Sequence, residues 1–143
     1  MIMVYLKIHE GEKIPSTRLA ASLQTNPSLV RQMLSQLNRA GLIKTQRGSA
    51  RPTFTRPLDE ITALDVYRAS QPTNDILVVD HKTSKECSVG VAFPNVIAPH
   101  FTALQQAMED RLAKLTIAQL VAETEADIAA HEGQMPRVAG AGE

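Results

Sequence analysis

Hydrophobic positions near the start of the chain predict two short helices. Residues 1–9 are mostly apolar and fit a short helix that Gly11 ends. Ser16 is then expected to cap a second helix, because a serine side chain can accept a hydrogen bond from a free N–H of the first turn. The apolar residues of that helix are Leu19, Ala20 and Leu23.

A third helix is expected to start at Asn26-Pro27 and to run to about residue 40, where Gly41 suits its C-terminal end. At 100° per residue its apolar side chains fall on one side. These are Val30, Met33, Leu34 and Leu37. The opposite side is polar and carries no acid: Ser28, Arg31, Gln32, Ser35 and Arg39. Such side chains can donate hydrogen bonds to phosphates or read base edges in a major groove.

A short hairpin follows the third helix. Residues 42–45 read as one strand and 53–55 as its partner, linked by a polar segment. The tip carries arginines on both sides of a flexible glycine, at Arg47, Gly48 and Arg51, and can lie along a DNA backbone or reach a minor groove. Three helices followed by a two-stranded hairpin is the order of a winged helix-turn-helix domain.

The middle of the chain holds weaker signals. Thr62 and Asp65 have the spacing of a capping box, which predicts a helix to about residue 70. Residues 75–80 contain four consecutive aliphatic side chains and predict a short buried strand or a turn of helix. Residues 81–87 form a polar loop, and Pro94 and Pro99 are expected to break or kink whatever precedes residue 100.

The last third is helical by its periodicity. One stripe recurs at steps of three and four: Phe101, Leu104, Met108, Leu112 and Leu115. A capping box from Thr116 to Gln119 predicts the start of a new helix, and residues 117–128 carry a second apolar stripe. A short domain cannot bury both stripes alone, so dimerisation is expected. The tail from Gly133 is expected to be disordered.

Charge changes the picture that total composition gives. The 143 residues carry 15 basic and 15 acidic side chains, so the formal net charge is zero. Residues 1–70 nevertheless hold ten basic and five acidic residues, and residues 71–143 hold the reverse. Between Glu12 and Asp59 there are eight basic residues and no acid. This asymmetry indicates nucleic-acid binding by the first half.

Several classes of protein are disfavoured. No phosphate-binding glycine loop, HExxH, GxSxG or CxxC motif is present, so no enzyme is predicted, and the neighbouring acids Glu109 and Asp110 are expected to lie on a solvated helix face. No apolar run reaches a membrane-spanning length and no signal peptide is evident. With no Trp, three Phe and two Tyr, base-stacking platforms for single strands are improbable. The single cysteine fits a reducing cytoplasm.

Together these segments resemble the Rrf2-type transcriptional regulators, most closely their YwnA-like branch, over roughly residues 1–125. The resemblance is carried by Thr25–Leu34 with Leu37–Ile43, by Ile61–Ala69, by Cys87–Gly90 and by Ala107–Thr116. It implies a homodimer that binds a palindrome-like double-stranded DNA operator. The same side chains, Ser28, Arg31, Gln32 and Ser35, then fall on the recognition helix, and Arg47 and Gly48 on the wing.

The chain departs from the family pattern at three places. The first helix is shorter by about ten residues, and Arg51-Pro52-Thr53 stands where many members have Gly-Gly-Tyr in the wing. Sensor members ligate an iron–sulfur cluster with three cysteines, whereas this chain has Cys87 alone. An iron–sulfur cluster is therefore not expected, because such clusters take about four ligands, mostly cysteine. His81, six residues before Cys87, adds only a weak metal signal, and His9, His100 and His131 show no ligand spacing.

Cys87 has two possible roles. It follows a polar loop and is expected to open a helix, where a thiolate is favoured, so it is a candidate redox switch. The alternative is a small buried hydrophobe.

The sequence thus predicts a mainly α fold with a small β-hairpin. Residues 1–70 form the winged helix-turn-helix domain, residues 71–132 an effector or linker region with the dimerisation helices, and residues 133–143 a tail. The predicted function is a cytoplasmic, homodimeric, sequence-specific DNA-binding transcriptional regulator, with repression expected. The alternative is a winged-helix module that binds another protein instead of specific DNA.

Overall fold

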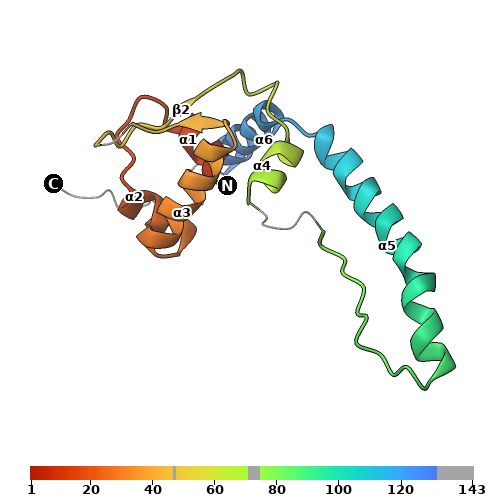
Figure 1. Cartoon of the computed structure of the whole chain (residues 1–143). Coiled ribbons are helices and arrows are strands. Elements are labelled where there is room, and N and C mark those ends of the chain that lie inside the picture. Colours follow the sequence, from red (N-terminus) through yellow and green to blue (C-terminus); the bar gives the residue numbers. More distant parts are fainter. Residues whose placement is uncertain (47, 71–74, 132–143) are drawn as a thin grey trace.

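The computed structural model describes residues 1–46, 48–70 and 75–131 and divides them into a winged body and a long arm (Figure 1). In these ranges there are six helices and one two-stranded sheet. The elements in chain order are α1 (Ile2–Ile8), α2 (Ser16–Leu23), α3 (Pro27–Arg39), β1 (Ile43–Lys44), β2 (Thr53–Phe54), α4 (Ala63–Ser70), α5 (Ser88–Ala113) and α6 (Ile117–Ala130). The mainly α fold with a small hairpin that the sequence predicts is confirmed.

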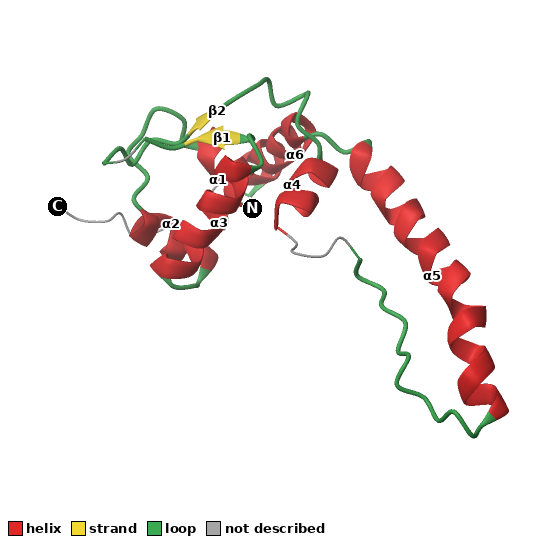
Figure 2. Ribbon diagram, viewed as in Figure 1, coloured by secondary structure: helices red, strands yellow, loops and turns green. Residues whose placement is uncertain are grey.

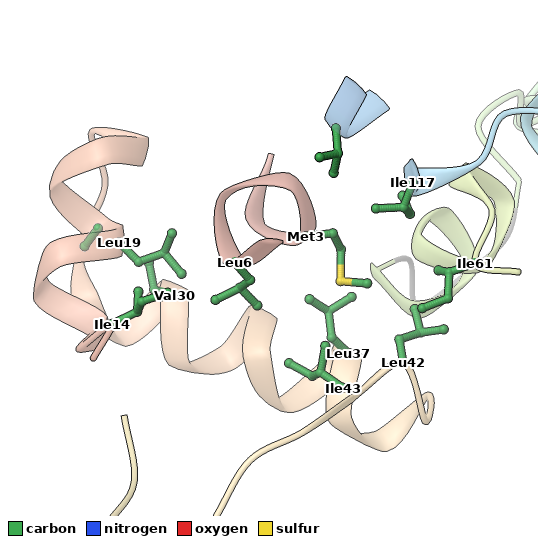
Figure 3. Packing of buried hydrophobic residues seen from close by; sticks show 12 residues of the cluster. Met3, Leu6, Ile14, Leu19, Val30, Leu37, Leu42, Ile43, Ile61 and Ile117 are labelled. Carbon is green, nitrogen blue, oxygen red and sulfur yellow. The ribbon is translucent and has the colours of Figure 1, made fainter. Parts of the chain in front are cut away.

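The core of the body lies between α1, α3, the hairpin and the start of α6. Met3 and Leu6 of α1 point toward Val30 and Leu37 of α3 (Figure 3). The large side chains that are almost completely buried come from four different parts of the chain: Leu19, Val30, Leu42 with Ile43, and Ile61. Burial of apolar side chains is the main favourable term in folding, so this cluster fixes how α3 sits in the body.

The start of α3 forms as its sequence predicts. Asn26 is the N-cap, and its Oδ1 accepts a hydrogen bond from the Leu29 N–H at 2.8 Å, while Pro27 occupies the first helical position. Gly41 follows the C-terminal end with φ of 72°, a left-handed conformation that glycine adopts without strain. The prediction that Ser16 caps α2 is wrong. Pro15 occupies the N-cap position in an extended conformation, and Ser16 is already the first helical residue.

The hairpin is the wing of the body. β1 and β2 pair antiparallel, with Ile43 opposite Phe54 and Lys44 opposite Thr53. The loop before α2 holds the hairpin from the side, because the N–H of Ile14 donates to the carbonyl of Ala50 at 2.7 Å. The wing is therefore held to the body by this hydrogen bond as well as by the pairing of its two short strands.

The last helix returns to the body. The chain around residue 116 pairs with the chain around residue 62, with Ala63 N–H donating to Leu115 and Ile117 N–H to Ile61. α6 then packs along α1, which buries Ile117 and Val121. Residues 117–128 were expected to need a second copy to cover their stripe. For the first half of the stripe that expectation is wrong, because α1 of the same chain covers Ile117 and Val121, whereas Ile128 is exposed.

The arm consists of α5 and the segment 75–87, which runs from the α4 side of the body to the far end of α5 (Figure 2). α5 continues for 26 residues through Pro94 and Pro99, so the predicted break does not occur. Pro94 has no N–H to give to the carbonyl of Gly90, four residues earlier. That carbonyl instead accepts the hydroxyl of Thr83 at 2.5 Å, so it remains hydrogen-bonded.

The segment 75–80 is neither a buried strand nor a turn of helix. It has no regular structure, and its aliphatic side chains Ile76, Leu77 and Val78 are exposed. No neighbouring strand lies beside it in the described ranges, so its apolar pattern has no sheet to join. The predicted disordered tail from residue 133 lies outside the described residues.

Candidate nucleic-acid interface

The outward face of α3 is where the predicted recognition residues lie together. Ser28, Arg31, Gln32, Ser35 and Arg39 are all exposed. On the opposite side of the same helix Val30 and Leu37 are buried, and Met33 and Leu34 are partly buried. The face assignment from the helical period is therefore confirmed, and the role of these residues stays a prediction.

Two serines on this face contact two arginines. The guanidinium of Arg31 donates to Ser28 Oγ at 3.1 Å, one turn before it, and that of Arg39 donates to Ser35 Oγ at 3.3 Å. Both arginines thus lie along the helix surface, with most of their five N–H donors still free to bind a ligand.

Ion pairing separates the arginines of the body into two groups. Away from the α3 face, Arg18 pairs with Glu12 at 2.6 Å, Arg56 with Asp65 at 3.3 Å and Arg68 with Glu109 at 2.8 Å. Within the described residues no acid lies within ion-pair distance of Arg31, Arg39 or Arg51. Among the described arginines of the body, those without an internal counter-ion therefore lie on α3 and the hairpin.

The Arg18–Glu12 pair belongs to a cluster that joins the end of α1 to the start of α2. Hydrogen bonds from Arg18 and then from His9 lower the pKa of Glu12 and keep its carboxylate ionised. The ring of His9 also lies against that of Tyr5, with 4.4 Å between centroids. This cluster joins α1 to α2. Because Arg18 is ion-paired with Glu12 within it, Arg18 stabilises the fold and is not counted among the candidate DNA-binding residues.

The structure describes two of the three predicted DNA-binding residues of the hairpin. Gly48 has φ of 81° and takes the turn that a side-chain-bearing residue would adopt only with strain. Arg51 is exposed beside it, whereas Arg47 lies outside the described residues. Two contacts that the sequence pattern did not reveal fix the hairpin on α3: Asn38 Oδ1 accepts from Thr45 N–H at 3.4 Å, and Thr55 Oγ1 donates to the Gly41 carbonyl at 2.5 Å.

The predicted dimerisation residues, four on α5 and Leu115 just after it, do not share one environment. Phe101, Met108, Leu112 and Leu115 are partly buried within the chain, and Leu104 is exposed. A different face of α5 is fully open. Its residues follow at steps of four and three and form what we call the outer stripe: Val89, Phe93, Val96, His100, Ala103 and Ala107. Val89 is 68% exposed, Phe93 57% and Val96 58%.

Glu109 is not on a solvated helix face as expected. Its side chain is 14% exposed and pairs with Arg68 of α4. Gln105, one turn earlier, donates to Glu109 Oε1 at 2.8 Å and accepts from the backbone N–H of Ile76 at 3.1 Å. Donation by Gln105 and then by Arg68 lowers the pKa of Glu109. These polar contacts join the arm to the body, and no hydrophobic pattern signals them.

Comparison with known proteins settles the family. Residues 1–123 match the Rrf2 family, described as an iron-dependent transcriptional regulator. The chain belongs to the Rrf2 family. It is 32% identical over 110 residues to the HTH-type transcriptional regulator YwnA of Bacillus subtilis. The aligned residues cover 77% of this chain and 83% of that protein.

Solved structures agree with this assignment. A DNA-binding protein with 29% sequence identity superposes with a TM-score of 0.66, covering 83% of this chain and 95% of that one. CymR, the global cysteine regulator of B. subtilis, shares the fold with a TM-score of 0.59 at 22% identity, covering 85% and 87%. This Rrf2 protein is therefore a winged-helix, DNA-binding transcriptional regulator, and the homologues that it matches are regulators and not enzymes.

The family description raises the question of iron, and the donor set of this Rrf2 protein does not fit a cysteine-ligated cluster. Cys87 is the chain's single cysteine, and it lies exposed at the N-cap of α5 without a hydrogen bond from its side chain to the first turn. Within the described ranges no three His, Cys, Asp or Glu side chains gather closely enough to hold a metal ion. One thiol per chain falls short of the ligand set that iron–sulfur clusters take.

The long α5 raises a second question, whether it spans a bilayer. Its apolar segment is not hydrophobic enough to do so, and neither is any other helix in the part of the chain that the structure describes. The exposed apolar residues of the arm therefore need another explanation.

Proposed function

We propose that this protein is a homodimeric repressor that binds a palindrome-like operator by placing α3 in the major groove of each half-site. Ser28, Arg31, Gln32, Ser35 and Arg39 are the residues of α3 that face the DNA. Of these, Ser28, Arg31 and Gln32 lie nearest the N-terminal end, the end by which recognition helices usually reach the bases. Such a role places the protein in the cytoplasm and needs no iron–sulfur cluster.

The observation that carries this proposal is the distribution of unpaired arginines. Arg31, Arg39 and Arg51 have no acidic partner among the described residues, while three other arginines of the body are neutralised. Guanidinium groups without a counter-ion bind phosphate strongly and can bind guanine with two hydrogen bonds. Within the body, the described arginines without an acidic partner all lie on α3 or the hairpin, which supports one continuous DNA-facing surface.

The wing extends that surface along the duplex. Its attachment through Ile14, Asn38 and Thr55 holds the exposed Arg51 at a fixed distance from α3. We assign Arg51, with Arg47 and Gly48, to the backbone or the minor groove flanking the half-site. Contacts of this kind set register on the duplex and contribute affinity rather than sequence preference.

The second copy is assigned to the outer stripe of α5. From Ser88 to Met108 the helix has no Asp, Glu, Lys or Arg, and its outer stripe lies open. An apolar, uncharged helix face that is identical on both copies is complementary to itself, as a two-fold interface requires. Leu104 borders this stripe, whereas Phe101, Met108, Leu112 and Leu115 stabilise the arm within each chain.

Titration of a duplex with the protein at rising salt tests the DNA-binding proposal against the alternative of a protein-binding module. Binding through several phosphates must weaken steeply with rising salt, because the release of counter-ions from the duplex becomes less favourable. Arg39→Ala and Arg51→Ala must each reduce the salt slope by about one. Arg111→Ala, at the exposed end of α5, is the matched control and must keep the parent slope. A flat salt response in the parent would contradict the proposal.

A further inference from the structure

Leu29 is an unusual side chain on the DNA-facing end of α3. It is 37% exposed, while its neighbour Val30 is completely buried. Every other large hydrophobic residue described as exposed lies on the arm, at the first residue of the chain or near the end of α6. In the described residues 2–70, Leu29 is therefore the large hydrophobic side chain that is most open to solvent.

The position of Leu29 is fixed by its surroundings. It is the third residue of α3, and Asn26 Oδ1 holds its N–H at 2.8 Å. Val30, the next residue, is anchored in the core. Among the exposed residues assigned to the bases and phosphates, Gln32 lies one turn after Leu29 on the same side of α3, whereas Arg31, two residues later, points away from it. Leu29 thus belongs to the group that enters the groove first.

Leucine can recognise only one feature of a major groove. It has no hydrogen-bond donor or acceptor, and the C5-methyl group of thymine is the apolar group that base pairs display there. We propose that Leu29 is a specificity-determining residue that contacts a thymine methyl in each half-site, next to the base that Gln32 reads. The proposal rests on α3 being the recognition helix.

Replacing thymine by deoxyuridine in the operator tests this contact, because it removes the methyl group and leaves all hydrogen bonds intact. The operator is first obtained by selection from random duplexes with the parent protein. Each thymine is then replaced in turn, in both half-sites together, and affinity is measured by fluorescence anisotropy. At one position the parent must lose about fourfold in affinity per half-site, the change expected for one methyl group that is no longer buried.

The protein variants complete the test. Leu29→Ala must bind the thymine duplex more weakly and must no longer distinguish thymine from deoxyuridine at that position. Leu29→Met keeps an apolar side chain of similar reach and must retain the distinction. Circular dichroism of both variants checks that the protein still folds. Because Leu29 is exposed, its replacement is expected to leave the fold intact.

Each outcome decides the proposal. A specific operator with no position sensitive to deoxyuridine, or a Leu29→Ala protein that still distinguishes the two bases, would overturn the role of Leu29 and leave α3 as the recognition helix. A parent that binds all duplexes equally would overturn both proposals. Loss of the distinction in Leu29→Ala alone, with Leu29→Met unchanged, is the result expected.

Discussion

The guanidinium of Arg68 on α4 lies 2.8 Å from the carboxylate of Glu109 on α5. This ion pair connects the winged body to the arm, across 41 residues of sequence. α4 also packs on α3, so one element lies between the arm and the helix that we propose to bind the operator.

Acidification should weaken this junction. Gln105 and Arg68 lower the pKa of Glu109 in the folded protein, so ionised Glu109 stabilises the fold. That stability is fully present above the ordinary pKa of a glutamate and is lost as pH falls through the lowered folded value. The parent is therefore expected to have a higher Tm than Glu109→Gln near neutral pH, with the difference shrinking toward zero in acid.

Thermal melts of the two proteins across this pH range provide the measurement. Glu125→Gln is the control, because Glu125 is exposed on α6 and has no hydrogen bond among the described residues. A Tm difference between parent and Glu109→Gln that stays constant with pH would show that the carboxylate charge does not stabilise the junction.

Removing buried volume at the start of α6 should destabilise the winged body. Ile117 is 3% exposed in the core, and Ile117→Ala is expected to cost about 2–5 kcal/mol in the free energy of unfolding. Ile128→Ala, on the same helix but 38% exposed, should change it by less than about 0.5 kcal/mol. Urea unfolding gives both values. Equal effects would mean that α6 does not belong to the core.

A charge in the outer stripe should separate the dimer. Phe93→Glu places a carboxylate in the middle of the proposed apolar contact, where its desolvation is unfavourable. Sedimentation is expected to show a dimer for the parent and a monomer for this variant at micromolar concentration. Thr102→Glu adds the same charge to an exposed position away from the stripe and should remain dimeric. A monomeric parent would contradict the assignment of the stripe.

Local sequence signals predicted the winged body well. The start of α3 depends on Asn26 and Pro27, and its buried side on the helical spacing of Val30 and Leu37, so both follow from neighbouring residues. The hairpin and the capping box of Thr62 with Asp65 are equally local; Asp65 N–H donates to Thr62 Oγ1, and Thr62 N–H donates to the Asp65 carboxylate.

The arm was predicted less well because its structure depends on contacts between distant residues. The carbonyl that Pro94 leaves free is satisfied by Thr83, which lies in a loop outside the helix. A proline rule applied to the helix alone cannot anticipate such a donor. The packing of residues 117–128 could not be predicted for the same reason, because their partner α1 lies at the other end of the sequence.

Sequence periodicity also could not predict which face of α5 is exposed. Two apolar stripes exist on this helix, and periodicity alone does not say which one the chain covers itself. The structure covers Phe101 and Met108 in part and leaves Phe93 and Val96 exposed. The candidate DNA-facing residues needed no such long-range information, because they share one helix.

Whether α3 reads the operator can be measured by selecting binding sites from random duplexes with the parent and with Arg31→Ala. The parent is expected to enrich a palindrome-like site. Arg31→Ala is expected to lose base preference at one position in each half, worth about 1–3 kcal/mol if that contact is bidentate. The same site with the same preference at every position in both proteins, or no enriched site with the parent, would show that α3 does not read the operator.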